Sequence, residues 1–353
     1  MCPGSLADII ENLEGDVGDG GDKRREEWKD IARDFDDRKA MKQIASGLRH
    51  LHALGLVHRD IKPQNILISS SSSSRGPYRM LISDFGLCKK LDVDQSSSLP
   101  TTYGFIAAGT AGWRAPEMLQ CAHDELESSD TLATSDDTIS SVPTTIDGSS
   151  SGTSTTICRC LTKSVDIFAL GCLFYYILTK GEHPYGNRFE REDNIIKDIK
   201  DLSLIYPNEE ARDLITHMLH RQPSQRPDIE TCLLHPFFWD SAKRLAFLRD
   251  ASNRFEIMCK DPMDRALIRL ERYAKSIIKT NWRPTLDQSS DQILIKNLRQ
   301  SRKYDGNSLR DLLRVLRNKV SFHSNMYIYV VEFSFNMNRK AITKTSPMTL
   351  NFN

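Results

Sequence analysis

The stretch "VHRDIKPQNIL", residues 57–67, decides the fold and much of the chemistry open to this chain. It contains Asp60, a carboxylate able to take a proton from an attacking hydroxyl group. Lys62 can neutralise a phosphate in transfer, and Asn65 offers an amide oxygen to a metal ion. The stretch therefore predicts phosphoryl-transfer chemistry, and the strength of that prediction depends on whether companion motifs follow it in order.

Four companion motifs follow it. "SDFG" (83–86) supplies Asp84, a hard oxygen ligand suited to Mg²⁺, with Phe85 and Gly86 allowing the chain to turn. The others are "GTAGWRAPEM" (109–118), "SVDIFALGCLFYYILTKGEHPYG" (164–186) and "RQPSQRPD" (221–228). One such motif alone would be weak support, but all five in this order make a chance match negligible.

With these motifs, residues 1–239 resemble the C-terminal lobe of a eukaryotic protein kinase, and "KPQN" after Asp60 resembles the serine/threonine type. The resemblance implies that Asp60 is the catalytic base, with Lys62 beside the transferred phosphate. It implies that Asn65 and Asp84 bind the Mg²⁺ that accompanies ATP. "MCPGSL" (1–6) is similar to the hinge that meets adenine, so Cys2 joins the expected ATP-binding residues.

The same resemblance implies structural roles for other motif residues. Glu117 is expected to pair with Arg226, and Asp166 is expected to brace the catalytic loop from the start of the apolar helix. His58 is expected to be a packing residue.

The segment between Asp84 and Glu117 is rich in hydroxyl groups. Arg59 beside Asp60 marks the kinase type whose activation segment is ordered by phosphate, because a guanidinium group pairs with phosphate bidentately. The candidates for trans-autophosphorylation are Ser96, Ser97, Ser98, Thr101 and Thr102. The alternative interpretation is a polar loop.

Periodicity predicts the elements around the first motif. Apolar residues at three- and four-residue spacing over 41–51 indicate a helix that leads into "VHRD". "NILI" (65–68) and "RMLI" (79–82) predict two short strands around a Ser-rich turn. The stretch "IFALGCLFYYIL" (167–178) is too short to span a bilayer and predicts a buried helix.

Composition excludes several classes of protein. The 48 Lys and Arg residues balance the 47 Asp and Glu residues, so net charge gives no hint of nucleic-acid or membrane binding. The N-terminus has no signal-peptide pattern, and the eight scattered cysteines predict reduced thiols.

The composition of residues 11–30 and 120–160 predicts flexible loops. The glycines of 15–21 alternate with aspartates and follow no apolar strand, so they do not predict a phosphate-binding loop.

Residues 240–319 carry a second resemblance. "DPMDRALIRLERYAKSIIKTNWRPTLDQ" (261–288) and "LRQSRKYDGNSLRDLLRVLRNK" (298–319) resemble the ribonuclease extension of the inositol-requiring sensor kinase/endoribonucleases of the unfolded-protein response. The related interferon-induced ribonuclease shares this architecture, but its kinase motifs are degenerate. The Ser/Thr-rich insert suggests a fungal form. The expected fold is mainly α: a kinase C-lobe with short β-ribbons, then an all-helical ribonuclease extension.

The resemblance implies an RNA-cleaving site that needs no metal. Tyr304, Arg317 and Asn318 match its tyrosine and its arginine–asparagine pair, whereas the family histidine falls on Phe322, one residue before His323. Residues 320–353 are β-branched and aromatic, unlike the expected domain, and we interpret them as a tail outside the family that originates from a translated intron. The resemblance implies self-association through both domains, a stem-loop RNA substrate and no DNA partner.

No "VAIK"-like segment is found in the 353 residues, so the kinase N-lobe is expected to be absent from this chain, along with any upstream membrane span. Two main hypotheses follow. The chain is an incomplete portion of a sensor kinase and endoribonuclease from the cytosolic face of the endoplasmic reticulum, with impaired activity, or it is a non-catalytic binding module. An in-frame "GxGxxG…VAIK" upstream would favour the first.

Overall fold

The computed structural model describes residues 4–13, 31, 33–70, 78–91, 109–120, 162–206, 208–258, 263–274, 278 and 304–319. The chain divides into two compact units. The first unit comprises Met1–Ile205 and Leu214–Leu233, and the second unit comprises Tyr206–Asp213 and Leu234–Asn353.

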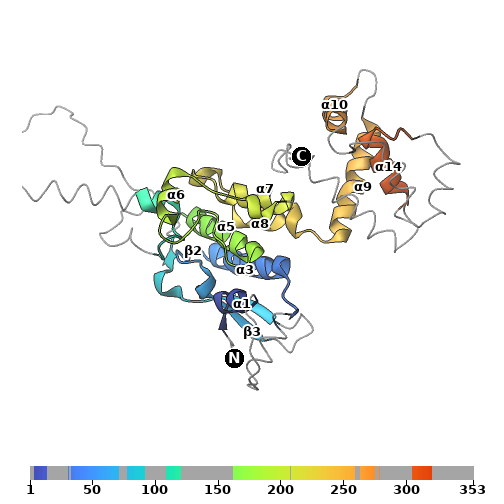
Figure 1. Cartoon of the computed structure of the whole chain (residues 1–353). Helices are drawn as coiled ribbons and strands as arrows, with labels where there is room; N and C mark the ends of the chain where they lie inside the picture. Colours follow the sequence, from blue (N-terminus) through green and yellow to red (C-terminus); the bar gives the residue numbers. More distant parts are fainter. Residues whose placement is uncertain are drawn as a thin grey trace, which may run out of the picture. The chain divides into compact units, whose positions relative to one another are not determined.

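A three-stranded antiparallel sheet and one long helix form one end of the first unit (Figure 1). The sheet has the order β1 (Gly4–Ser5), β3 (Ile66–Ser70), β4 (Tyr78–Ile82), and α1 (Leu6–Leu13) follows β1. Helix α3 (Asp37–Ala53) packs against β4. Its first turn is capped by the Asp36 side chain, which accepts a hydrogen bond from the backbone N–H of Lys39.

The predicted elements around the first motif are confirmed. The apolar positions of α3, from Met41 to Leu51, are buried on one face of the helix. Strands β3 and β4 pair in the register Ile66 with Ile82 and Ile68 with Met80. A second ribbon pairs β2 (Leu56–Val57) with β5 (Lys89–Lys90). The two ribbons fix both ends of the segment 58–65, because β2 enters it and β3 leaves it.

Helix α5 (Ser164–Thr179) is the predicted buried helix of the first unit, and most of its side chains are buried. A helix that is apolar on all sides is stable only inside a core. Shorter helices follow it: α6 (Arg191–Lys197), α7 (Glu209–Met218) and α8 (Ile229–Leu234). Short 3₁₀ turns span Pro63–Asn65, Phe85–Leu87, Ser203–Ile205, Pro223–Gln225 and Pro236–Phe238. In the part of the chain that the structure describes, no helix has both the length and the apolar character needed to cross a bilayer.

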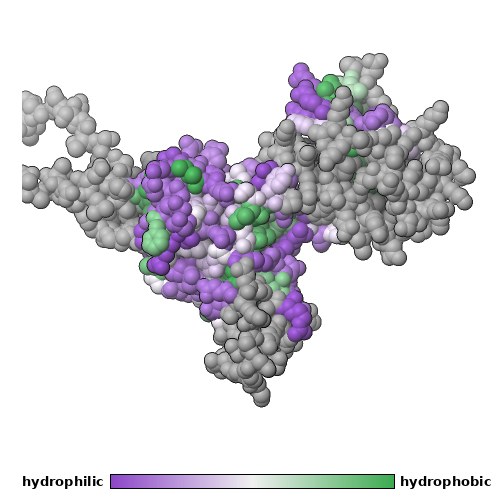
Figure 2. All heavy atoms as spheres, in the orientation of Figure 1, coloured by the Kyte–Doolittle hydropathy of each residue, from purple (hydrophilic) through white to green (hydrophobic). Residues whose placement is uncertain are grey.

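The surface of the described residues is mainly hydrophilic on the face drawn in Figure 2, with hydrophobic residues scattered among polar ones. Phe189 is the extreme case, with 98% of its surface exposed. Scattered apolar residues of this kind are ordinary on a folded protein and do not by themselves mark an interface.

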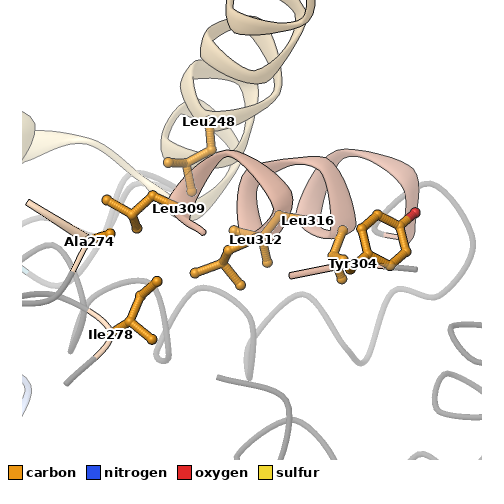
Figure 3. Packing of buried hydrophobic residues seen from close by; sticks show 8 residues of the cluster. Leu248, Ala274, Ile278, Tyr304, Leu309, Leu312 and Leu316 are labelled. Atoms are coloured by element: carbon orange, nitrogen blue, oxygen red, sulfur yellow. The ribbon is translucent and has the colours of Figure 1, made fainter. Parts of the chain in front are cut away.

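The described part of the second unit is mostly helical, as expected for the extension. Helices α9 (Ser241–Ile257), α10 (Arg265–Arg272) and α14 (Leu309–Lys319) are its main elements. Helices α9 and α10 both contact α14. Figure 3 shows their shared core, which consists of Leu248, Ala274, Ile278, Tyr304, Leu309, Leu312, Val315 and Leu316. This core orients α14, whose C-terminal turn carries two of the predicted ribonuclease residues, Arg317 and Asn318.

Candidate functional site

A buried carboxylate, that of Asp166, anchors the backbone of the loop that carries Asp60. Asp166, in the first turn of α5, accepts hydrogen bonds from the backbone N–H groups of His58 at 2.9 Å and Arg59 at 2.8 Å. His52 Nε2 lies 2.9 Å from the same carboxylate. Arg59 has a φ of 70°, a strained value for a residue other than glycine, and these hydrogen bonds hold it there. The predicted bracing role of Asp166 is therefore confirmed.

His58 links this loop to the "DFG" turn. Its Nδ1 accepts a hydrogen bond from the backbone N–H of Asp60 at 3.3 Å, so Nε2 carries the proton and donates to the Ser83 carbonyl at 3.0 Å. The imidazole ring also meets the Phe85 ring edge-on, at 5.5 Å between centroids. His58 is fully buried, and these contacts confirm that it is a packing residue.

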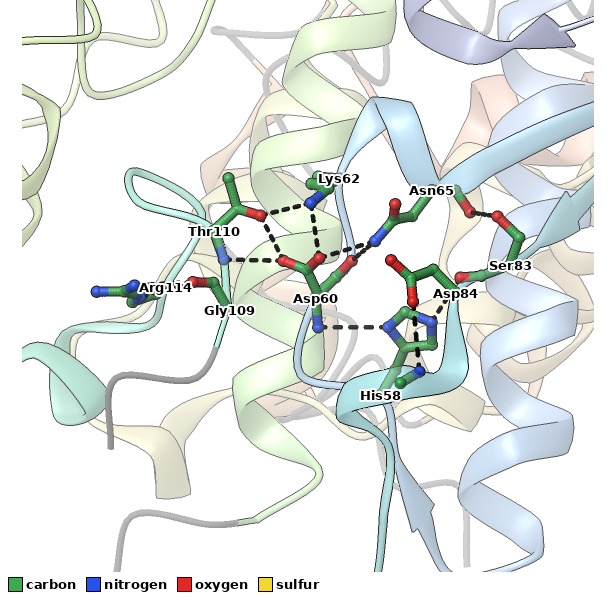
Figure 4. A network of polar contacts seen from close by, with 10 residues as sticks. His58, Asp60, Lys62, Asn65, Ser83, Asp84, Gly109, Thr110 and Arg114 are labelled. Atoms are coloured by element: carbon green, nitrogen blue, oxygen red, sulfur yellow. Dashed lines mark hydrogen bonds and ion pairs between the residues drawn. The ribbon is translucent and has the colours of Figure 1, made fainter. Parts of the chain in front are cut away.

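Asp60 is the centre of a polar network in which both carboxylate oxygens are used (Figure 4). Oδ1 accepts hydrogen bonds from the backbone N–H of Thr110 at 2.8 Å and from the Thr110 hydroxyl at 2.7 Å. Oδ2 accepts from Lys62 Nζ at 2.7 Å and from Asn65 Nδ2 at 2.8 Å. The fold therefore brings Asp60, Lys62 and Asn65 together.

The network also sets the protonation state of Asp60. Burial by itself would raise the pKa of this carboxyl group, but hydrogen bonds from Lys62 and Thr110 outweigh burial and lower the pKa below its usual value. Asp60 is therefore ionised at neutral pH. A carboxylate in this state can orient a hydroxyl group and accept its proton as the hydroxyl attacks phosphorus.

Asn65 and Asp84 carry the oxygen atoms that a magnesium site requires; Asn65 is buried and Asp84 is exposed. Asn65 donates through Nδ2 to Asp60, and its amide oxygen takes no hydrogen bond from any residue that the structure describes. Asp84 has a φ of 61°, is exposed, and accepts a hydrogen bond from the Gly86 N–H at 3.3 Å. One carboxylate and one amide oxygen suit Mg²⁺, which takes its remaining ligands from phosphates and water. Among the described residues there is no cluster of three or more His, Cys, Asp or Glu side chains able to bind a metal without such help.

Thr110 is a member of the site that the sequence analysis did not single out. Its hydroxyl also accepts a hydrogen bond from Lys62 Nζ at 2.5 Å, so it bridges the lysine and the carboxylate. Helix α6 fixes the segment around it, because Glu192 accepts a hydrogen bond from the Gly112 N–H at 3.0 Å. The Arg191 guanidinium lies over the Trp113 ring at 5.9 Å. The signal available in the sequence was the position of Thr110 in "GTAGWRAPE".

Glu117 and Arg226 form the predicted internal ion pair. Two parallel hydrogen bonds of 2.7 Å join the guanidinium to the carboxylate, and the Arg226 side chain is fully buried. Arg226 also donates to the carbonyls of His220, Arg221 and Ser164. This pair ties the segment 109–120 to the base of α5.

The expected phosphate-binding role of Arg59 is not tested by its contacts. Its Nε donates to the Leu87 carbonyl at 2.5 Å, and burial lowers the pKa of the guanidinium. Five of the expected site residues, Ser96, Ser97, Ser98, Thr101 and Thr102, lie outside the described residues, as does Cys2.

The second unit brings its three predicted residues together. Asn318 Nδ2 donates to the Tyr304 hydroxyl at 3.4 Å, and Arg317 Nε donates to Asn318 Oδ1 at 3.1 Å. Asn318 therefore bridges the phenol and the guanidinium. The Tyr304 ring is 8% exposed and packs into the core at the end of α14, as Figure 3 shows. Phe322 and His323 lie outside the described residues.

Two carboxylates fix the position of α14. Glu271 accepts hydrogen bonds from the Ser308 hydroxyl and from the backbone N–H groups of Leu309 and Arg310, so it satisfies the first turn of the helix. Arg314 forms a bidentate ion pair with Glu256 of α9. The side-chain hydrogen bond from Arg314 lowers the pKa of Glu256 to about 2.

Two protein families match this chain, one over the part that contains Asp60 and one over the part that contains Tyr304 and Arg317. The protein kinase domain family matches residues 17–134 and 157–238, and the ribonuclease 2-5A family matches residues 244–337. The second match continues beyond Lys319, into the segment that the sequence analysis assigned to a tail outside the family.

The curated relatives include a sensor for unfolded proteins and serine/threonine-protein kinase/endoribonucleases. The chain is 41% identical over 326 residues to the sensor for unfolded proteins in the ER ire1 of Schizosaccharomyces pombe, covering 90% of this chain and 27% of the relative. It is 40% identical over 333 residues to serine/threonine-protein kinase/endoribonuclease IRE1 of Hypocrea jecorina, covering 92% and 25%. The human serine/threonine-protein kinase/endoribonuclease IRE2 is 34% identical over 335 residues, covering 94% and 30%. The chain thus spans about a quarter to a third of the length of these relatives. On these matches, the chain belongs to the protein kinase family, within the group of kinase/endoribonucleases in which a ribonuclease 2-5A domain follows the kinase domain.

Proposed function

We propose that this chain is part of a serine/threonine protein kinase and endoribonuclease of the unfolded-protein response. In that protein, ATP-dependent trans-autophosphorylation is coupled to RNA cleavage in mRNA splicing. The observation that carries the proposal is the network around Asp60, in which Lys62, Asn65 and Thr110 all converge on one ionised carboxylate. A kinase-like lobe that only binds partners does not require this arrangement of three polar groups around one carboxylate. A kinase homologue with degenerate motifs does not require it either.

In the kinase reaction, Asp60 accepts the proton of the attacking serine or threonine hydroxyl, and Lys62 stabilises charge on the transferred phosphate. Thr110 holds both groups in place through its bridging hydroxyl. Asn65 and Asp84 would hold Mg²⁺, which supplies neutralisation of the ATP phosphates. Cys2 would lie near adenine.

In the ribonuclease reaction, the ribose 2′-OH gives its proton to a base and attacks the adjacent phosphate. A 2′,3′-cyclic phosphate forms, and the 5′-oxygen leaves as it takes a proton from a donor. Such a site requires a cation for the phosphate and groups that move protons. Arg317 supplies the cation, Tyr304 supplies a hydroxyl at the reacting centre, and Asn318 holds both through its amide. The substrate would be a stem-loop RNA, bound by dimers or oligomers that form through both domains. No DNA partner is proposed.

We propose the cytosolic face of the endoplasmic reticulum membrane as the site of action; the fission-yeast relative is named a sensor for unfolded proteins in the ER. We propose Ser96, Ser97, Ser98, Thr101 and Thr102 as phosphorylation sites, with Arg59 among the groups that capture the phosphate. Mass spectrometry of the stressed full-length protein should find phosphate between residues 91 and 102, and its absence there would count against this part of the proposal.

The chain by itself is proposed to be a weak enzyme. Its 353 residues include no glycine-rich loop followed by a "VAIK"-like lysine, and the histidine position is occupied by Phe322. If residues 320–353 are a translated intron, replacing them with the spliced continuation should restore cleavage of stem-loop RNA. Equal rates for both forms would contradict an intron origin. The ribonuclease 2-5A match, which extends to residue 337, also argues against that origin.

A chimera tests the proposed function most fully. In it, the matched segment of this chain replaces the corresponding part of the fission-yeast sensor, which supplies the rest of the protein. We expect the chimera to support growth under endoplasmic-reticulum stress, and the Arg317→Ala variant to fail. The Asp60→Asn variant should lose autophosphorylation. A chimera that folds and phosphorylates itself normally with Asn at position 60 would rule out the kinase mechanism.

The runner-up function is a non-catalytic module that binds partners through a kinase-like lobe. It predicts that Asp60→Asn and Arg317→Ala leave growth of the chimera unchanged. An interferon-type ribonuclease predicts that only Arg317→Ala matters. The three outcomes separate the three functions.

A further inference from the structure

The guanidinium group of Arg317 is held on two of its nitrogens. Nε donates to Asn318 Oδ1 at 3.1 Å, and one terminal nitrogen, Nη1, donates to Asn253 Oδ1 at 3.3 Å. Asn253 lies on α9, 64 residues earlier in the sequence. Among the residues that the structure describes, the other terminal nitrogen, Nη2, donates to none. No described residue therefore competes with an outside acceptor for its N–H groups.

The position of Asn253 follows from the way α9 packs on α14. Asn253 and Glu256 are three residues apart on α9, and Arg314 and Arg317 are three residues apart on α14. Residues at this spacing lie on the same face of a helix. Glu256 pairs with Arg314, so the same alignment of the two helices brings Asn253 to Arg317.

The two arginines differ in what faces them. Arg314 meets the carboxylates of Glu256 and Asp311, which offset its charge. Arg317 meets two amide oxygens instead. Glu256 attracts it at longer range, but among the described residues Arg317 forms no ion pair within 4.0 Å. An amide oxygen orients a guanidinium group without neutralising it, so the positive charge of Arg317 remains available to a phosphate.

We propose that Asn253 is a positioning residue of the ribonuclease site, which orients Arg317 so that its Nη2 edge meets the phosphate of the RNA. The inference rests on the proposed ribonuclease function, and it adds a residue from outside the motif that carries Tyr304, Arg317 and Asn318. Asn253 acts through Arg317 and does not itself touch the reacting atoms.

Loss of the Asn253 acceptor should weaken RNA binding and leave the fold intact. Asn253 is exposed, so its side chain carries little of the packing. A hydrogen bond of this kind contributes about 0.5–1.5 kcal/mol, which converts to a change in Kd of about 2- to 12-fold. The full removal of Arg317 should cost more, because it deletes the phosphate contact itself.

The test is a double-mutant cycle on the full chain. The probe is a stem-loop RNA with a 2′-deoxyribose at the scissile position, which binds but is not cleaved, and its Kd is measured at one fixed salt concentration. Asn253→Leu removes the acceptor at nearly constant side-chain size, and Asn253→Asp retains an oxygen acceptor. Melting temperatures of all variants are measured alongside.

We expect Asn253→Leu to weaken binding, Asn253→Asp to weaken it further because the added carboxylate offsets the charge of Arg317, and melting temperatures to remain unchanged. In the Arg317→Ala background, Asn253→Leu should have no further effect. An equal effect of Asn253→Leu in both backgrounds would overturn the inference, as would no effect in either. If Arg317→Ala itself binds as tightly as the unaltered chain, the proposed RNA site falls, and the inference falls with it. The single Arg317→Ala variant therefore distinguishes failure of the proposed RNA site from failure of the proposed role of Asn253.

Discussion

Asn318 donates a hydrogen bond through Nδ2 to the hydroxyl of Tyr304, at 3.4 Å and across 14 residues of sequence. The two residues meet because the Tyr304 ring is part of the core beneath α14, whose last turn carries Asn318. The packing of the ribonuclease extension thus holds the Tyr304 hydroxyl within reach of Asn318. The hydroxyl of Tyr304 is the only part of that side chain that the chemistry requires.

Removing this hydroxyl should separate activity from stability. Tyr304→Phe keeps the buried ring, so we expect the free energy of unfolding to fall by less than about 1 kcal/mol, the contribution of one weak hydrogen bond. RNA cleavage should fall at least about tenfold, because a positioned proton-transfer group contributes that much or more. Cleavage rates and urea denaturation measure the two effects. Tyr304→Leu is the matched control, which should lower both.

The ion pair between Glu256 and Arg314 should make the second unit sensitive to acid. The pKa of Glu256 is lowered to about 2 from the usual 4.5, chiefly by the hydrogen bond from Arg314. Because the folded-state pKa is the lower one, the stabilisation is complete above pH 4.5 and is lost as the pH falls towards 2. The Glu256 side chain is 32% exposed, so solvent screening reduces its contribution to about 1–2 kcal/mol.

The variant Glu256→Gln should therefore be less stable than the unaltered chain at pH 7, and the difference should shrink as the pH falls from 4.5. Urea denaturation at a series of pH values measures it. A difference that stays constant down to pH 3 would show that the pair contributes through packing alone.

The buried pair of Glu117 and Arg226 should be a strong determinant of stability in the first unit. Arg226→Met leaves the Glu117 carboxylate without its bidentate partner, and removal of one member of a buried pair costs about 3–5 kcal/mol. The double variant Glu117→Gln with Arg226→Met should recover part of this loss, because no charge is then left unpaired. Thermal denaturation of the single and double variants provides the comparison, and an exposed pair such as Arg49 and Glu230 is the control expected to have little effect.

The kinase half should transfer phosphate very poorly when this chain is assayed alone. Positioning of the triphosphate supplies most of the catalysis in phosphoryl transfer, and Asp60 and Asp84 by themselves do not hold it. Purified chain incubated with ATP and Mg²⁺ should show turnover close to the background of the Asp60→Asn variant. Robust turnover that disappears with Asp60→Asn would contradict the expectation.

The sequence predicted the local features well because each depended on a short motif. The roles of Asp166, His58 and the Glu117–Arg226 pair followed from motifs whose members keep fixed positions. The helix over 41–51 and the strands on either side of the Ser-rich turn followed from periodicity. Neighbouring residues carried the information for the helix and the strands, whereas the Asp166 and Glu117–Arg226 contacts join segments more than 100 residues apart and followed from the family resemblance.

The contacts that the sequence did not predict join segments whose alignment depends on packing. Thr110 reaches Asp60 across 50 residues, and Glu271 caps α14 from 38 residues away. Asn253 meets Arg317 only because α9 and α14 pack in one register. The three-residue spacings on α9 and α14 can be seen in the sequence. The sequence does not indicate, however, that these faces of the two helices pack against each other.

The central claim is that Tyr304, Asn318 and Arg317 form an RNA-cleaving site in which the ribose 2′-OH is the nucleophile. It is tested most directly by incubating a stem-loop RNA with the full chain in the presence of EDTA and analysing the new ends. We expect slow cleavage that resists the chelator, leaves a 2′,3′-cyclic phosphate, and is abolished by Arg317→Ala. Cleavage that requires added Mg²⁺, or that proceeds equally with Ala at position 317, would contradict it.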